Sequence, residues 1–325
     1  MKNTKTMIES SSLPAQPEAV TPQQLLCACC CKGGGTVPPC CAEGAERLVL
    51  IAGNAPDSHI KLVTAFDEAG ARNHRFDAMK PQERKRDLDI LQKLGLTPET
   101  VKTPRVLYEL IAQRIPEPGP ICGQCARETD TWRNCPLAAC EYYAKGLKSI
   151  LPKRSVEEMR SAKERSCACL HAAAELSVRA HHLLCMLCFA GSGTELAPLE
   201  EDNLFELLQK ILENPQIPIV LREGAGECIV CPPCHAFDEA SGLCVTSPSL
   251  RDRRKDLAVL ERLALDPGDR IPAKDLLARI AQEIPNVSGI CLFEQETAFE
   301  WSNCQTLAED TYEKGLAYVC QALGI

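Results

Sequence analysis

Residues 111–122, IAQRIPEPGPIC, return 169 positions later as residues 280–291, IAQEIPNVSGIC. The same offset places Arg86-Asp87-Leu88 on Lys255-Asp256-Leu257. Further matches at this offset are Trp132, Asn134 and Cys135 with Trp301, Asn303 and Cys304, and Lys145-Gly146-Leu147 with Lys314-Gly315-Leu316. Chance does not hold one register from residue 86 to residue 147, so the chain contains an internal duplication.

The offset changes upstream of this block. Residues 25–30 match residues 183–188 at an offset of 158, and residues 65–69 match residues 236–240 at an offset of 171. We assign the difference of 13 residues to an amphipathic helix that copy two has and copy one lacks. Its apolar positions are Leu204, Leu207, Leu208, Ile211 and Leu212.

This register predicts four segments. They are a flexible tail over residues 1–24, a cysteine-rich repeat over 25–150, a helical connector over 151–179 and a second cysteine-rich repeat over 180–325. The predicted fold is therefore two pseudo-symmetric cysteine-rich repeats joined by a helical connector.

The fold class predicted for each repeat is mainly α with minor β. An apolar stripe over residues 88–94 ends at Gly95, and Thr103-Pro104 is typical of the start of a helix. Two short runs, residues 48–51 and 217–221, are predicted strands.

Charge and hydrophobicity exclude two classes of partner. The net charge is −8, and the basic runs at residues 84–86 and 251–255 are interleaved with acidic side chains, so nucleic acid is not a predicted partner. No apolar run reaches the ~18 residues that span a bilayer, and the first 24 residues lack the apolar core of a signal peptide. We expect no membrane partner and a cytoplasmic location.

Cysteine is the outlier of the composition, with 21 residues in 325. A reducing cytosol keeps thiols free, and closely spaced free thiols bind metals. Two quartets are the strongest candidates for cofactor binding and metal ligation: Cys122, Cys125, Cys135 and Cys140, and Cys228, Cys231, Cys234 and Cys244. Four thiolates complete either a tetrahedral zinc site or a four-iron cluster, and buried, inert thiols are the alternative.

Weaker candidates lie at the start of each repeat. Cys27 and Cys30 recur as Cys185 and Cys188, so these four are the weaker predicted ligands. The N-terminal group, which also contains Cys29, Cys31, Cys40 and Cys41, holds either a third cluster, a soft ion such as Cu(I) or only exposed thiols. Cys167 and Cys169 form another candidate quartet with Cys185 and Cys188. The internal alignment gives copy one Asp57, Ile60, Val63 and Asn73 where copy two has its quartet, which suggests that the two copies have kept different sites.

The histidine pair His181 and His182 precedes Cys185 on a predicted helix. Hydrogen-bonded, half-buried imidazoles are the favoured interpretation, and a ligand or a proton donor is the alternative. The chain has no Gly-x-Ser-x-Gly motif, phosphate-binding loop or nucleotide fingerprint. No catalytic residue is assigned.

Residues 179–185, RAHHLLC, with Phe189 and Gly191, resemble the opening of a family of small bacterial and archaeal cysteine-rich domains of unknown function. The similarity continues through Cys228-x2-Cys231-Pro232, Cys244, Cys291, Trp301 and Gly315-Leu316. The resemblance implies iron–sulfur binding, with Cys185 joining Cys228, Cys231 and Cys244 in place of Cys234. Glu294 departs from the Cys-x-x-Cys of the family at this point.

The sequence predicts an iron–sulfur protein with two or more [4Fe-4S] clusters that transfers electrons, or delivers them, to a redox partner protein. One alternative is an iron–sulfur redox enzyme or reductive activator with a site between the repeats. The other is a zinc-stapled interaction module, in which zinc replaces the clusters.

Overall fold

The computed structural model describes residues 16–123, 129, 132–193, 195–245, 249–292, 298–302, 304 and 310–325, apart from the side chains of residues 40, 41, 249 and 299. Of the predicted flexible tail, residues 1–15 therefore lie outside the described residues. The chain divides into two compact units, Met1–Pro152 (unit 1) and Lys153–Ile325 (unit 2). Helices dominate both units and the strands are short, which confirms the mainly α class with minor β.

Unit 1 contains, in chain order, β1 (Glu18–Val20), α1 (Pro22–Lys32), α2 (Pro39–Asn54), β2 (Ile60–Leu62), the 3-10 helix η1 (His74–Phe76), α3 (Pro81–Leu94), β3 (Val101–Lys102), α4 (Pro104–Arg114), α5 (Gly119–Cys122) and α6 (Tyr142–Leu147).

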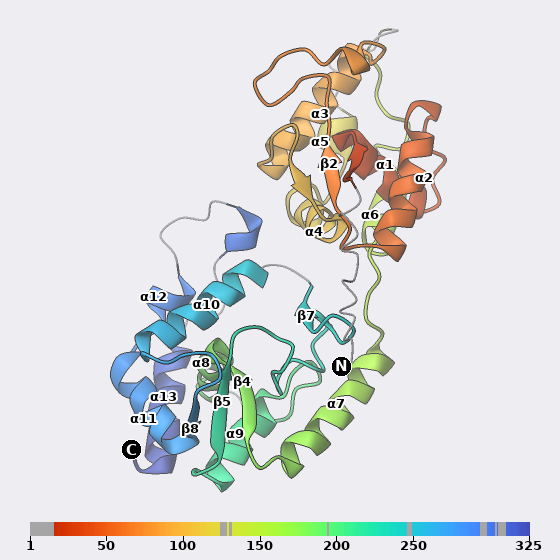
Figure 1. Ribbon diagram of the computed structural model, residues 1–325. Helices are drawn as coiled ribbons and strands as arrows, with labels where there is room; N and C mark the ends of the chain where they lie inside the picture. The colour runs from red at the N-terminus through yellow and green to blue at the C-terminus, as the bar shows by residue number, and fades with distance from the viewer. Residues whose placement is uncertain are drawn as a thin grey trace, which may run out of the picture. The chain divides into compact units, whose positions relative to one another are not determined.

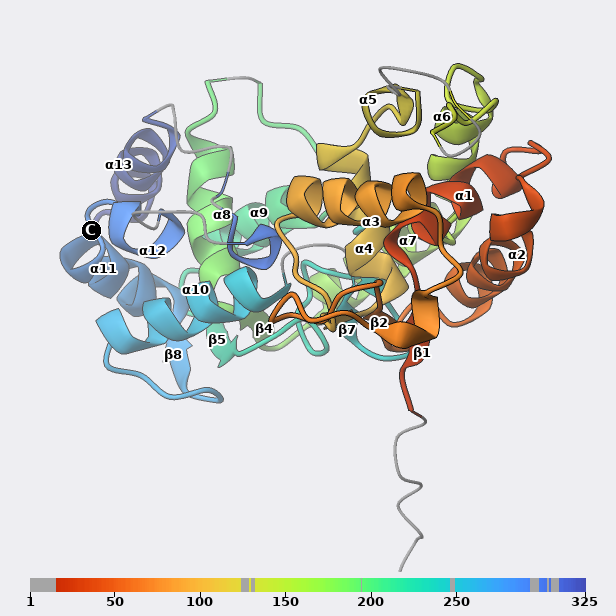
Figure 2. The same ribbon diagram turned by 90° about the horizontal axis from the view of Figure 1, so that it is seen from above.

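Unit 2 contains α7 (Val156–Ala172), β4 (Leu176–Arg179), α8 (Ala180–Ala190), α9 (Leu204–Glu213), β5 (Pro218–Arg222), β6 (Phe237–Asp238), β7 (Leu243–Cys244), α10 (Ser249–Arg262), β8 (Arg270–Pro272), α11 (Ala273–Glu283), α12 (Ser288–Cys291), the 3-10 helix η2 (Phe299–Trp301) and α13 (Thr311–Leu323). Figures 1 and 2 show the helices of each unit gathered around that unit's own small sheet.

The two units share one topology. In unit 1, β1 pairs in parallel with β2, and β2 pairs in antiparallel with β3. In unit 2, β4 pairs in parallel with β5, and β5 pairs in antiparallel with β8. The strand orders β1-β2-β3 and β4-β5-β8 are thus equivalent, as the internal repeat predicts.

Local signals place several helix ends where the sequence predicts them. The Thr103 side chain accepts a hydrogen bond from the Val106 backbone at the start of α4, and Pro104 occupies the first turn. Gly95 ends α3 in the left-handed conformation, with φ of 67°. Side-chain capping and a residue without a Cβ therefore set these two helix ends.

The predicted site of the length difference between the copies is wrong. Copy one has a helix, α2, at the place in the element order that α9 occupies in copy two. The equivalent strand registers match Leu62 with Leu221. Leu62 is followed three residues later by Ala65, whereas Leu221 is followed fifteen residues later by the equivalent Ala236. The twelve additional residues of unit 2 therefore lie in the loop after β5.

Two other local predictions need correction. Residues 48–51, a predicted strand, lie within α2, because a short apolar run does not distinguish a strand from a buried helix turn. Residues 18–24 belong to β1 and the start of α1, where the Gln24 side-chain oxygen accepts the Thr21 backbone N–H at 2.8 Å. The predicted strand at residues 217–221 is confirmed as β5.

The helical connector comprises α7 and β4, which pack within unit 2.

A close helix pair forms the centre of each unit: α1 against α6 in unit 1, and α8 against α13 in unit 2. Gly146 on α6 faces the Cys29 carbonyl oxygen, and Gly315 on α13 faces the Leu187 carbonyl oxygen. A Cβ at either glycine would overlap that oxygen. The glycines of the Lys-Gly-Leu repeat thus allow the two backbones to touch.

None of the described helices combines the length with the apolar character that crossing a membrane requires.

We predict that Gly315→Ala lowers the free energy of unfolding by about 1–3 kcal/mol, because the added methyl group forces the two helices apart. Urea denaturation of the purified chain measures this change. Gly53→Ala is the matched control: Gly53 lies on the exposed side of α2, with no atom within 4 Å of an added Cβ. It should leave stability unchanged or raise it by up to ~1 kcal/mol. Equal losses for both variants would contradict the close-packing explanation.

Candidate metal centres

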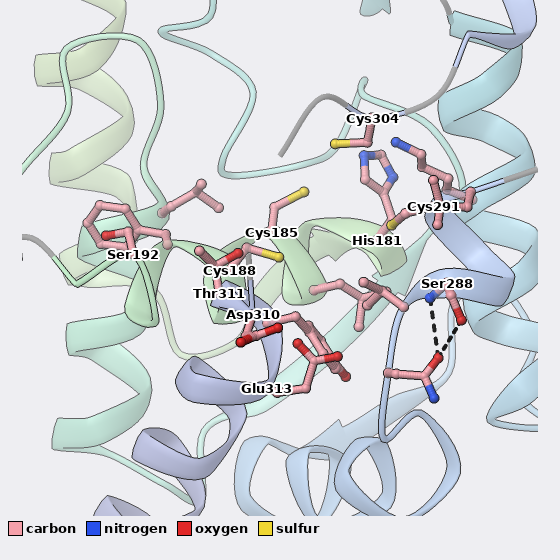
Figure 3. Close-up of a pocket in the computed structure, with 18 residues that line it drawn as sticks. His181, Cys185, Cys188, Ser192, Ser288, Cys291, Cys304, Asp310, Thr311 and Glu313 are labelled. Carbon is pink, nitrogen blue, oxygen red and sulfur yellow. Dashed lines mark hydrogen bonds between the residues drawn. The ribbon is translucent and has the colours of Figure 1, made fainter. Parts of the chain in front are cut away.

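Four cysteines of unit 2 line one cavity of about 660 Å³. Cys185 and Cys188 lie three residues apart on α8, so their side chains share one face of the helix. Cys291 ends α12, and Cys304 follows η2. Figure 3 shows the four sulfur atoms turned toward one shared space, with the His181 imidazole beside it.

The same four positions meet in unit 1. Cys27 and Cys30 on α1 are the counterparts of Cys185 and Cys188. Together with Cys122 at the end of α5 and with Cys135, they line a cavity of about 20 Å³. Both units therefore bring together a Cys-x-x-Cys pair on one helix (α1 or α8) and two cysteines from the C-terminal part of the repeat.

Burial makes the unit 2 thiols weak acids. Burial and, to a smaller extent, the neighbouring cysteines of the quartet raise the pKa of Cys185 well above its usual value and the pKa of Cys188 to about 11. The buried Lys255 ammonium acts in the opposite direction on Cys185 and on Cys291. Four thiolates in this cavity thus require a bound cation, because a metal deprotonates the thiols that coordinate it.

The first predicted quartet is divided. Cys122 and Cys135 lie together, with Cys27 and Cys30 as their partners in the cavity. Cys125 lies outside the described residues. Cys140 is not among the residues that line this cavity, and its thiol donates to the Pro136 carbonyl oxygen at 3.6 Å.

The second predicted quartet lies in a different part of unit 2. Cys228 and Cys231 sit in the twelve-residue insertion, next to His182 on α8. The His182 Nδ1 atom is 3.3 Å from Cys228 Sγ and 3.9 Å from Cys231 Sγ. The three ligand atoms all lie within 4.8 Å of one another, and they form a possible His/Cys metal site.

Cys234 and Cys244 lie beside this group. Cys234 interacts electrostatically with both Cys231 and Cys244, and its sulfur accepts the Ala236 backbone N–H at 3.4 Å. Cys244 belongs to the hairpin of β6 and β7, where it pairs with Phe237. The insertion in unit 2 explains why copy one has no counterpart for Cys228, Cys231 and Cys234: the loop is absent there, so Asp57, Ile60 and Val63 do not replace them.

The pKa values of the Cys228 and Cys231 thiols shift in opposite directions. Burial alone would raise the pKa of Cys228, but hydrogen bonds with Cys231 and His182 lower it well below its usual value. The Cys231 thiol, hydrogen-bonded to Cys228, has a raised pKa. The backbone N–H of Arg179 also donates to Cys228 Sγ at 3.3 Å. Of the two thiols, Cys228 is therefore the stronger acid.

The remaining cysteines have other surroundings. Cys29 on α1 is fully buried in the core, at the position of Leu187 in unit 2. Cys167 on α7 contacts the Asn203 side chain, and Cys169 is exposed. Cys40 and Cys41 lie in α2, outside the described side chains. No disulfide joins any of the cysteines whose side chains are described.

A buried ion network holds the start of α8. Asp256 on α10 is fully buried, and its Oδ2 accepts from Arg179 Nε at 2.9 Å and from the Gly224 backbone N–H at 3.2 Å. Its Oδ1 accepts the His181 backbone N–H at 3.1 Å and lies 2.7 Å from His181 Nδ1. Burial opposes its ionisation, but His181 and Arg179 hold the pKa of Asp256 at about 2.

This network fixes the chemical state of His181. Burial lowers the pKa of His181 to about 4, so the imidazole is neutral at pH 7. Because the Asp256 carboxylate only accepts hydrogen bonds, the proton of the neutral ring resides on Nδ1. His181 lines the cysteine cavity, and its Nε2 lone pair is the basic atom that remains.

Unit 1 keeps the carboxylate and changes its partners. The Asp87 Oδ1 atom on α3 accepts the Gln23 backbone N–H at 2.8 Å, which is the same contact that Asp256 makes with His181. Gln23 and Gln24 stand where unit 2 has His181 and His182, and Thr21 stands where unit 2 has Arg179. The helix anchor is thus shared, whereas the histidines belong to unit 2 alone.

The sequence contained signals for the residues that the predictions missed. The cysteine sets of the two cavities match pairwise in the internal alignment, so retention in both copies could have grouped them. Asp87 and Asp256 match in the same alignment and are fully buried acids. No sequence signal linked His182 to Cys228, because this contact depends on how the inserted loop folds onto α8.

We predict that Asp256→Asn lowers the free energy of unfolding by about 3–5 kcal/mol, because it leaves the Arg179 guanidinium buried without a counter-ion. Urea denaturation of the purified chain measures the loss. Glu239→Gln is the control, because this half-exposed carboxylate contacts Arg154 and Arg165 at the surface and should contribute less than ~1 kcal/mol. Similar losses for the two variants would contradict a structural role for the buried network.

Comparisons with protein-family models, with curated proteins and with solved structures found no match to this chain. What is established is a cysteine-rich protein whose described residues contain one possible His/Cys metal site.

Proposed function

We propose that each unit holds one [4Fe-4S] cluster and that the protein transfers electrons to a redox partner protein. The unit 1 ligands are Cys27, Cys30, Cys122 and Cys135, and the unit 2 ligands are Cys185, Cys188, Cys291 and Cys304. When bound, a cluster supplies iron and sulfide that exchange an electron.

The observation that carries the proposal is the recurrence of one cysteine quartet around a cavity in both units. The units differ in the inserted loop, in the histidines and in the size of the cavity, yet these four positions hold cysteine in both. Inert core thiols would not need to be cysteine in both units, because apolar residues replace them readily. Cys29, for example, corresponds to Leu187 in unit 2.

In unit 2, where the cavity of about 660 Å³ has room for a cluster, the quartet fits a cluster better than a single ion. Among the described residues, the group whose ligand atoms all lie within 4.8 Å of one another is His182, Cys228 and Cys231. The quartet thiols are therefore more widely spaced around their cavities, as ligands on four separate iron atoms must be. A cation accompanies each quartet: Lys255 in unit 2, and Arg86 in unit 1, which donates to the Cys122 carbonyl oxygen at 3.4 Å.

The resident residues have distinct tasks in such a site. The two helices α1 and α8 hold the Cys-x-x-Cys pairs rigidly, which limits the structural change that accompanies each electron. The positive charge of Lys255 offsets the charge of the thiolates and favours the reduced state. The net charge of −8 suits docking on a basic partner.

A second candidate function, an iron–sulfur redox enzyme, is favoured by one difference between the units. The unit 2 cavity is about 660 Å³, against about 20 Å³ in unit 1. The basic Nε2 of His181 and the carboxylates of Asp310 and Glu313 line the larger cavity. Room for a small molecule beside the unit 2 cluster would allow reduction coupled to proton transfer.

The ligand assignment is tested by iron content. Anaerobically purified protein should be brown and carry about eight iron atoms per chain, four for each cluster. Cys27→Ser should remove about half of the iron. Cys140→Ser should remove none, although the spacing in the sequence places Cys140 in the quartet and leaves Cys27 out. Loss of iron in Cys140→Ser with retention in Cys27→Ser would contradict the assignment, and protein without iron would contradict the function.

The electron-transfer role is tested by potential. In a Cys27→Ser background, which retains the unit 2 cluster, Lys255→Met should make the midpoint potential more negative, because the reduced cluster loses a nearby positive charge. Anaerobic redox titration followed by electron paramagnetic resonance measures this shift. Lys314→Met, which removes an exposed charge on α13, is the control and should change the potential little. Turnover of a small molecule at the unit 2 cavity would favour the enzyme instead.

A further inference from the structure

The inserted loop of unit 2 brings a second kind of metal site to α8. It contributes Cys228 and Cys231, with exposures of 3% and 5%, and both lie next to the His182 ring. Neither thiol lines the cavity of the unit 2 quartet, and His182 does not line it either. These three residues therefore form a group separate from the proposed cluster ligands.

The spacing of this group fits one ion. Zinc bonds of ~2.3 Å to sulfur and ~2.0–2.1 Å to nitrogen, at a tetrahedral angle, place the two ligand atoms about 3.6 Å apart. The distances from His182 Nδ1 to Cys228 Sγ and to Cys231 Sγ, 3.3 and 3.9 Å, lie on either side of this value. Ligands on different iron atoms of a cluster would lie farther apart.

The surroundings also fit a bound cation. The Arg179 backbone N–H donates to Cys228 Sγ, so the sulfur is oriented by a hydrogen bond from outside the ligand set. Cys231 N–H donates to the Cys228 carbonyl oxygen at 3.3 Å, which closes the turn that places both thiols on one side of the loop. Thiolate and imidazole ligands together favour zinc over magnesium or calcium.

We propose that His182, Cys228 and Cys231 bind one zinc ion, independently of the clusters. The ion joins the inserted loop to α8, the helix that also carries Cys185 and Cys188. Unit 1 lacks the loop and has Gln24 in place of His182, so it has no equivalent site. Unit 2 then holds two metal centres on α8. Zinc binds at His182 in the first turn, and the proposed cluster binds at Cys185 and Cys188 farther along the helix.

The test uses the full chain, produced anaerobically with iron and zinc both supplied. Elemental analysis should find about one zinc ion per chain. X-ray absorption at the zinc edge should show at least two sulfur ligands and one imidazole nitrogen, at ~2.3 and ~2.0–2.1 Å. Because the zinc edge is read separately from iron, this result does not depend on whether the clusters are present.

His182→Gln is the decisive variant, because glutamine is the residue that unit 1 carries at this position. Its zinc affinity, measured by competition with a chelator, should fall by at least ~100-fold, beyond the ~10–100-fold that loss of an outer-shell partner costs. His235→Gln is the matched control, since this exposed histidine follows Cys234 in the same loop and pairs with Glu201. It should bind zinc as the unmodified protein does.

Unchanged far-ultraviolet circular dichroism in His182→Gln will show that the variant is folded, and Cys228→Ser provides a second, independent removal of a ligand. Three results overturn the proposal. They are protein that contains no zinc when both metals are supplied, a zinc shell without nitrogen, and folded His182→Gln that retains zinc with its original affinity.

Discussion

Each unit depends on a buried carboxylate that accepts a hydrogen bond from the start of the Cys-x-x-Cys helix. Asp87 and Asp256 accept the backbone N–H of Gln23 and His181 at 2.8 and 3.1 Å, and each thereby joins the helix that bears it to the first turn of the Cys-x-x-Cys helix. A buried charge is tolerated only where hydrogen bonds compensate for lost water, so this contact permits little freedom of position. The helix that carries half of each cysteine quartet is thus held by a buried carboxyl group, and its thiols are presented at a fixed place in the cavity.

The two units show how a shared frame acquires different chemistry. The frame consists of the three-stranded sheet, the anchored helix and the close contact at Gly146 or Gly315. Unit 2 adds a loop of twelve residues directly after β5, at the end of the strand that pairs with β4. Because β4 leads directly into α8, an insertion at this point falls beside the first turn of the helix. The loop therefore reaches His182 without disturbing the cysteines farther along α8.

Local and repeated features could be predicted from the sequence, and contacts between distant segments could not. The Thr103-Pro104 helix start, the Gly95 end and the duplication itself depend on neighbouring residues or on direct matches within the chain. The grouping of Cys27 with Cys122 depends on the packing of α1 near α5, which spacing along the chain does not reveal. Proximity in sequence instead favoured Cys140, whose thiol bonds to the Pro136 carbonyl oxygen. The prediction placed the length difference at the α9 helix, because its amphipathic pattern is recognisable in the sequence. The irregular loop after β5, which contains the additional residues, has no such pattern.

The same Cys-x-x-Cys spacing has different consequences in a helix and in a loop. On α8, Cys185 and Cys188 follow the regular helical rise, so their thiols lie side by side along one face and point into a shared cavity. In the loop, Cys228 and Cys231 lie on a tight turn, and their sulfur atoms converge with the His182 nitrogen to within 4.8 Å. The helical pair borders a cavity with room for a group of several atoms, whereas the loop pair and His182 leave room for a single ion. The same motif therefore places its two sulfur atoms differently in a helix and in a loop.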